Sequence, residues 1–576
     1  MLFTLTAMIK RKYLLTVPFI VLPMLASMSA APISAGSANT KVEKPANVSG
    51  VSLRFVSRFT SGSGLGGAEI SAMDAKSKRL FSLDGAKNAI NIIDISNIKK
   101  PKLVKSVDLQ SKGVTGIQSI AAMNGLVAVA TVTTSKTEAG RVFMMDVNGN
   151  ILPGAPKGIV VGSLPDSIHF SPDGRFVLTA NEGEPKDYCK VNGVLPETSD
   201  PKGSVSIIDT TAKKLVATTL DFTAFSERAN GLIYAGGRVY GPGATVAQDL
   251  EPEYIAISQD SKTAWVTLQE NNAIATVDLE AGEIIGISGL GFKSYNTDAT
   301  GIDPSDRDKE SRVRAVPAFG MYQPDAVAVA RLGGNDYLFT ANEGDAREWP
   351  CLMGGTDGTI AEAEDVRYSS NGTVAALKTD ATLGRLNVTP FTPANISGTT
   401  ITGKTTVDEA YSLGARSFSV WRAPTVAGVF PADRIYDSGN FIEKKVLEVN
   451  GNYFNADWNT TAGTANLLDT RSDNKGPEPE GIAYGKAFGK HFIVVGLERD
   501  SGIMLFEVST PSAPQFVQYI STVDWTSSTF RVGGAGDISP EGILFIEAKN
   551  SPSKKPLVVV SYEVSGTVAI FELSSK

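Results

Sequence analysis

Acidic side chains recur at fixed places in a repeated unit of this chain. The clearest copy, residues 164–187, reads LPDSIHFSPDGRFVLTANEGEPKD, with one acid after its first proline and another after its second apolar run. Further copies begin at Leu250, Gln323, Glu478 and Ser539, and weaker ones at Ala68 and Ile117. The opening and closing acids form the pairs Glu69 with Asp84, Asp166 with Glu182, Glu253 with Glu270, Asp325 with Glu343, Glu480 with Glu498, and Glu541 with Glu563. Only the copy at Ile117, which has Gln118, lacks the opening acid.

These acids could bind a cation. Each copy reads as two antiparallel strands joined by a tight turn, so its two acids share one end of the hairpin. Crowded carboxylates need compensation from backbone N–H groups, basic side chains or bound cations. Oxygen ligands suit Ca²⁺, Mg²⁺ or Mn²⁺, and only 2 His in the chain disfavour a conventional zinc site. We expect Ca²⁺, alone or with a second metal such as iron.

The predicted metal ligands are the acids of the five stronger copies: Asp166, Glu182, Glu253, Glu270, Asp325, Glu343, Glu480, Glu498, Glu541 and Glu563. The alternative is that each acid accepts hydrogen bonds from the next loop and holds neighbouring repeats in register.

Two further side chains are candidates for catalysis. His169 lies inside a repeat, where most other copies have a small residue, and an imidazole there could act as an acid or base. The alternative is a buried, hydrogen-bonded histidine. Arg347, in EGDARE, could clamp a phosphate oxyanion or could be a structural counter-ion.

The two cysteines occupy equivalent loop positions. Cys189 and Cys351 each follow an ANEG motif by a few residues. In an exported protein such a pair most often forms a disulfide, and the alternative is thiolate ligation of a transition metal.

The repeats predict the fold. Seven copies, most followed by a further apolar run, indicate an all-β, seven-bladed β-propeller. Residues 51–59, VSLRFVSRF, alternate like a strand and are expected to complete the last blade, which removes an exposed edge. A long insertion, about residues 352–415, interrupts the fifth blade. The propeller is expected to cover residues 51–576, after a linker at 36–50.

Residues 1–35 read as a secretory signal peptide, with Lys10 to Lys12 before a short apolar run. We therefore expect an exported, periplasmic or extracellular protein with no integral membrane segment after cleavage, and a monomer. Loss of the three basic residues deepens the formal net charge from −7 to −10. An acidic surface disfavours nucleic acid as a partner.

The ANEG motifs, the segment LEPEYIAIS from Leu250, GIDPSDRD from Gly301, RSDNKGPEPEG from Arg471 and the closing SPEG unit resemble the bacterial choice-of-anchor I proteins. The resemblance implies a seven-bladed propeller that is exported or at the cell surface, and some members are described as atypical alkaline phosphatases. It specifies the fold more firmly than the reaction.

Two functions follow as hypotheses. The first is an exported metal-dependent phosphatase, a phosphoric monoester hydrolase that acts on a small phosphate ester. Its site would be the mouth of the central channel of the propeller, which the acids are expected to line. The second is a non-catalytic binding or adhesion propeller that takes a cell-surface ligand.

Overall fold

The computed structural model describes residues 41–42, 50–351, 367–368, 379–389, 391, 396–397, 400–401, 406–407, 409–459, 464–465, 468–527 and 534–575. The predicted signal peptide lies outside these residues, and so do most of the predicted linker and much of the predicted insertion. Within the described residues, no helix is long and apolar enough to cross a membrane.

Antiparallel sheets dominate the unit Ala38–Lys576. Each copy of the repeat supplies the first two strands of a sheet, and the following apolar runs supply the third and, in every sheet but the last, the fourth. The first four sheets hold β3 (Ser71–Asp74), β4 (Arg79–Asp84), β5 (Ala89–Asp94), β6 (Lys102–Asp108); β7 (Gly116–Met123), β8 (Leu126–Val132), β9 (Ala139–Asp146), β10 (Ile159–Ser163); β11 (Pro165–Phe170), β12 (Phe176–Asn181), β13 (Ser204–Asp209), β14 (Ala217–Asp221); and β15 (Pro252–Ile257), β16 (Thr263–Leu268), β17 (Ala273–Asp278), β18 (Glu283–Gly289), β29 (Gly428–Pro431).

Three more sheets follow in the same pattern. They hold β21 (Val327–Leu332), β22 (Asn335–Asn342), β28 (Ser417–Arg422), β30 (Asp433–Asp437); β33 (Pro479–Ala487), β34 (Lys490–Leu497), β35 (Gly502–Glu507), β36 (Gln515–Ser521), β1 (Lys41–Val42); and β37 (Pro540–Ile546), β38 (Leu557–Tyr562), β39 (Thr567–Ser575), β2 (Val51–Thr60). We call these sheets the first to seventh blades, in chain order.

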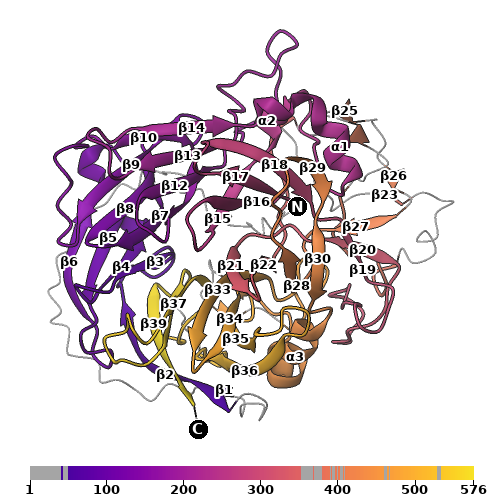
Figure 1. Ribbon diagram of the computed structural model, residues 1–576. Helices are drawn as coiled ribbons and strands as arrows, with labels where there is room; N and C mark the ends of the chain where they lie inside the picture. The colour runs from indigo at the N-terminus through magenta and orange to yellow at the C-terminus, as the bar shows by residue number, and fades with distance from the viewer. Residues whose placement is uncertain are drawn as a thin grey trace, which may run out of the picture. The chain divides into compact units, whose positions relative to one another are not determined.

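The first strands of successive blades pack against one another, and the first strand of the seventh blade contacts that of the first. Figure 1 shows β3, β7, β15, β21, β33 and β37 toward the middle, with β6 and β36 outside. Each neighbouring pair of blades buries an apolar cluster between its sheets, because a single blade cannot cover its own faces. The predicted all-β propeller class is confirmed, and the count of seven blades is our interpretation of these sheets.

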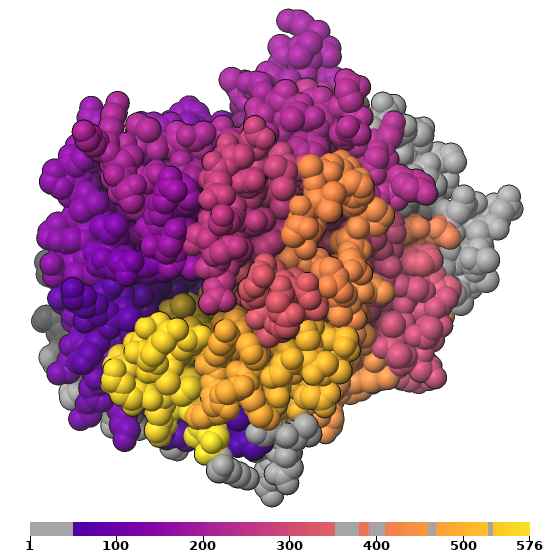
Figure 2. Space-filling view, viewed as in Figure 1, coloured from indigo at the N-terminus to yellow at the C-terminus, as the bar shows by residue number. Residues whose placement is uncertain are grey.

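The predicted closure by the N-terminal strand is also confirmed. β2 pairs antiparallel with β39, from Val51 opposite Ser575 to Thr60 opposite Thr567. Figure 2 shows the yellow C-terminal blade beside the indigo N-terminal segment. Part of the predicted linker is also structured, because β1 pairs with β36 of the sixth blade.

Further elements lie between the blades. The predicted insertion falls between β22 and β28, and its β27 (Ala410–Ser412) joins β19 (Phe292–Ser294) and β20 (Ala318–Met321) in a three-stranded sheet. Between the third and fourth blades lie α1 (Ala229–Tyr234) and α2 (Val246–Asp249), which we did not expect from the sequence. The short strands β23 (Arg367–Tyr368), β24 (Ile396–Ser397), β25 (Thr400–Ile401), β26 (Thr406–Val407), β31 (Trp458–Asn459) and β32 (Thr464–Ala465) form three two-stranded pairs.

The helix α3 (Phe441–Asn450) links the fifth blade to the sixth. It buries Ile442 and Val446, which lie four residues apart on one face and join the apolar cluster between these two blades. The same helix buries Glu443, whose contacts are described below.

Candidate metal centre and acidic networks

A β-bulge places the opening acid in most blades. Pro165 pairs with Asn181 and Ser167 pairs with Ala180, so Asp166 is the extra residue that the partner strand does not oppose. The same shift follows Pro252, Pro479 and Pro540, next to their acids. Because a bulge re-aims a side chain, it turns each acid out of the alternation of its strand.

The residue before the proline is also unusual. Leu164, Gln323, Glu478 and Ser539 all have positive φ, from 39° to 60°. This left-handed conformation costs roughly 1 kcal/mol in a residue other than glycine. Its recurrence at equivalent positions shows that the entry to the first strand is specified by the surrounding structure.

Three buried acids from two blades come together at one end of the strands. Glu182 follows β12, Glu253 lies in β15 and Glu270 follows β16, and they offer oxygen atoms within 4.8 Å of one another. All three are predicted ligands, and their exposed fractions are 0%, 4% and 2%. We call Glu182, Glu253 and Glu270 the acid triad.

A fourth carboxylate, Glu251, lies beside the acid triad. Burial raises its pKa well above the usual value, and Glu270 and Glu182 raise it further, although Arg347 opposes this shift. Burial is therefore the chief cause of this shift, and the neighbouring carboxylates contribute less. The sequence contains a signal for this residue, the Glu-Pro-Glu motif at 251–253, but only the second acid of the motif is among the predicted ligands.

Arg347 is engaged as a counter-ion. Its guanidinium is fully buried, with one nitrogen 2.6 Å from Asp249 Oδ1 and another 3.1 Å from Glu251 Oε1. The ring of Tyr240 lies 4.5 Å from the guanidinium carbon. The short helix α2, which begins with a capping box at Thr245, positions Asp249. Of the two roles considered for Arg347, this geometry favours the structural one.

Two further groups of acids share Glu343. Asp325, Glu343 and Glu480 form one, and Glu343, Glu478 and Glu498 form the other, each with oxygens within 4.8 Å. We call Glu343, Glu478 and Glu498, with their basic neighbours, the compensated network.

Basic side chains enter the compensated network. Lys475 Nζ lies 2.6 Å from Glu343 Oε1 and 3.2 Å from Glu478 Oε2. Burial opposes ionisation of Glu478, yet Arg471, Arg499 and Lys475 hold its pKa well below the usual value. Protein cations therefore neutralise Glu478, whereas burial raises the pKa of Glu498 well above its usual value even though Arg499 opposes this shift.

The other predicted ligands are more dispersed. Asp166, Glu541 and Glu563 share the same end of their blades, but among the described residues they belong to no group of three such acids. The acids therefore converge chiefly in the third to sixth blades.

His169 lies deeper along β11, where it pairs with Leu178 and its ring is 4.9 Å from that of Tyr254. Three residues of strand correspond to about 10 Å, so the imidazole is well separated from the acids at the strand end. Burial lowers its pKa to about 4, so the ring is neutral at pH 7. Its role in catalysis stays a prediction.

The predicted disulfide is confirmed, because Cys189 and Cys351 are bonded. It joins the loop after β12 to the loop after β22 and lies in an apolar cluster with Tyr188, Tyr240 and Phe391. Thiolate ligation of a metal by these two residues is therefore excluded.

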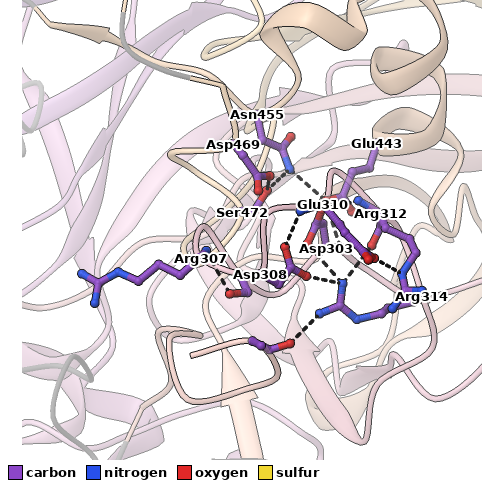
Figure 3. Close-up of polar contacts among 12 residues, drawn as sticks. Asp303, Arg307, Asp308, Glu310, Arg312, Arg314, Glu443, Asn455, Asp469 and Ser472 are labelled. Carbon is purple, nitrogen blue, oxygen red and sulfur yellow. Dashed lines mark hydrogen bonds and ion pairs between the residues drawn. The ribbon is translucent and has the colours of Figure 1, made fainter. Parts of the chain in front are cut away.

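A second set of acids surrounds residues 301–314, and sequence reasoning had noticed only its GIDPSDRD motif (Figure 3). Asp303 is fully buried, its Oδ2 accepts the Arg312 N–H at 2.5 Å, and Glu443 Oε1 accepts the Asp303 N–H at 3.2 Å. Burial raises the pKa of Asp303 to about 8, and Glu443 and Asp469 add to this shift. Burial likewise raises the pKa of Asp469 to about 7.

Arginines balance part of this charge. Arg314 lies 2.8 Å from Asp308 and 3.6 Å from Asp303, and Arg416 lies 2.8 Å from Glu443. The assembly ties the 301–314 loop to α3, as expected of a structural ion network.

The chain is similar to a known family of domains and to two named proteins. The choice-of-anchor I domain matches residues 69–511. Gigasin-3a of Magallana gigas is 28% identical over 213 residues, which are 36% of this chain and 70% of that protein. The mesenchyme-specific cell surface glycoprotein of Strongylocentrotus purpuratus is 27% identical over 292 residues, which are 47% of this chain and 37% of that protein. The chain therefore spans little more than a third of the glycoprotein.

Two solved structures are weakly similar to the chain. The Kuenenia stuttgartiensis hydrazine synthase has a TM-score of 0.42 at 12% identity, with 89% of this chain and 97% of that chain covered. The Cps50 (Swd1) β-propeller domain of Myceliophteria thermophila has a TM-score of 0.41 at 8% identity, with 91% and 100% covered.

Proposed function

This chain belongs to the choice-of-anchor I family, and we propose that it is an exported propeller that binds Ca²⁺ at the acid triad and hydrolyses a phosphate monoester there. The observation that carries the proposal is the convergence of Glu182, Glu253 and Glu270, buried and within 4.8 Å of one another. The signal-peptide pattern and a relative named as a cell surface glycoprotein support export.

The donor set fits calcium. Ca²⁺ binds oxygen ligands at about 2.3–2.6 Å, so oxygens up to about 5 Å apart can share one ion. Glu251 adds a fourth carboxylate beside the acid triad, and a bound cation would offset the repulsion among these side chains. The triad contains only carboxylates, which suit Ca²⁺ better than a soft or imidazole-preferring metal. Iron as a second metal remains part of the proposal.

The residues of the chain have distinct roles in this proposal. The acid triad holds the cation, and the bulge at Glu253 aims one of its ligands. Arg347 neutralises Asp249 and Glu251, which limits repulsion around the centre. When bound, the cation would polarise the phosphoryl group and favour attack by water.

The experiment combines elemental analysis with turnover. Purified mature protein is measured by plasma mass spectrometry and by hydrolysis of p-nitrophenyl phosphate at pH 7 to 10, with and without chelator. Stoichiometric calcium and chelator-sensitive turnover that Glu253→Gln abolishes are expected. Metal-free protein with no turnover would refute the proposal.

The second candidate is a non-catalytic binding propeller at the cell surface. The observation that favours it is the compensated network, because Lys475, Arg471 and Arg499 show that part of the acidic end serves a structural purpose. Stoichiometric calcium without turnover on any phosphate ester would favour this candidate.

A further inference from the structure

A cavity of about 780 Å³ lies between the second and third blades. Residues before β9, at the end of β10 and in the loop from β12 to β13 line it, so it opens at the same end of the strands as the acid triad. Its size is within the range of small-molecule sites, which is roughly 300–1,000 Å³.

The lining is rich in hydroxyl groups and charges. Six serine and threonine side chains contribute, together with Lys136, Lys186 and Lys202. The acids of the lining are Glu138, Glu197 and Asp221. Hydroxyls both donate and accept hydrogen bonds, which suits a ligand that itself carries many hydroxyls.

The loop that forms one wall is held in place. The Lys186 N–H donates to the Ser199 carbonyl at 2.8 Å, and the Tyr188 N–H donates to the Pro350 carbonyl at 2.8 Å. The Cys189–Cys351 disulfide lies in the same loop. Because the wall is already ordered, a ligand would lose less affinity to loop ordering on binding.

The three lysines differ in what they contact. Lys136 lies 3.2 Å from Glu184 and 3.5 Å from the centre of the Trp349 ring. Lys202 lies 3.1 Å from Asp221. Lys186 is exposed and makes no ion pair within the part of the chain that the structure describes. Lys186 is therefore the cation available to a ligand.

We propose that this cavity binds a saccharide that carries an acidic group, with the anion at Lys186 and the sugar hydroxyls at the serine, threonine and Glu197 side chains. The anion can be a carboxylate or a phosphate, because an ammonium group binds either as a point charge. This site does not depend on the proposed phosphatase activity.

Isothermal titration calorimetry on the full mature protein tests the site in buffer with chelator, so that catalysis does not enter the result. The probes are trigalacturonic acid, mannose 6-phosphate and neutral maltotriose. We expect at least one acidic probe to bind at least tenfold more tightly than maltotriose. Binding of trigalacturonic acid alone identifies a carboxylate, and binding of mannose 6-phosphate alone identifies a phosphate.

Variants complete the test. Lys186→Ala is expected to raise the Kd of the acidic probe at least fivefold. Lys214→Ala, an exposed lysine between β13 and β14 in the same blade, is expected to leave binding unchanged. The proposal is overturned if no acidic probe binds, if maltotriose binds equally well, or if Lys186→Ala binds like the wild type.

Discussion

Replacement of Glu253 by glutamine should change stability in opposite directions without and with calcium. The substitution removes one charge from the acid triad and keeps the size of the side chain. Two charges no more than 4.8 Å apart repel by at least about 3 kcal/mol at an effective dielectric constant of about 20. Removing Glu253 therefore removes two such repulsions.

In the presence of chelator, the net gain in the free energy of unfolding should be smaller than the sum of these two repulsion energies. Buried acids can retain their protons, and burial, together with Glu270 and Glu182, raises the pKa of the neighbouring Glu251. We expect Glu253→Gln to stabilise the calcium-free protein by about 1–2 kcal/mol. At a calcium concentration of about 100 times Kd, the wild type should gain about 2.7 kcal/mol, whereas the variant should gain less than about 1 kcal/mol.

The assay is differential scanning calorimetry at pH 7.5, first with chelator and then over a series of calcium concentrations. Glu541→Gln is the matched control, since Glu541 also follows the proline of a bulged first strand and is 5% exposed against 4% for Glu253. It belongs to no three-acid group among the described residues. The reasoning would be refuted if both variants lowered the melting temperature equally and calcium had no effect on the wild type.

Three other predictions concern stability. The pKa of Asp303 is raised to about 8 in the folded protein, so this carboxyl loses its proton first in the unfolded state, and the free energy of unfolding falls between about pH 4 and 8. Asp303→Asn should therefore reduce this loss of stability as the pH rises. Urea unfolding of the wild type and the variant at pH 5 and pH 9 checks this, and an equal change in the free energy of unfolding of both proteins would contradict it. Leu53→Ala should lower the free energy of unfolding by about 2–4 kcal/mol, because Leu53 is 2% exposed in the strand that closes the propeller. The side chain of its neighbour Arg54 is 63% exposed. Arg54→Ala should therefore lower the free energy of unfolding by less than about 1 kcal/mol in the same urea titration. Replacing Cys189 and Cys351 by serine should destabilise the protein by about 2–4 kcal/mol, because the bond closes a loop across a sequence separation of 162 residues; unchanged thermal unfolding with and without reductant would contradict this.

The amino-acid sequence by itself determined the type of fold and the common position of the acids. Strand alternation and turn residues recur in every repeat, and both are local properties of the chain. Antiparallel pairing then requires the opening and closing acids of a hairpin to share one end, which the pairing of Pro165 with Asn181 confirms. The closing strand and the disulfide were predictable for similar reasons, as an unpaired alternating segment and as two equivalent loop positions.

Only the tertiary structure decided which acids meet and which are neutralised. Glu182 and Glu253 come from different blades, so their distance depends on how the sheets pack and on the bulge at each proline. Lys475 and Arg347 reach their acidic partners from loops far away in the sequence. These contacts depend on side-chain burial and long-range packing, which a repeat pattern does not encode.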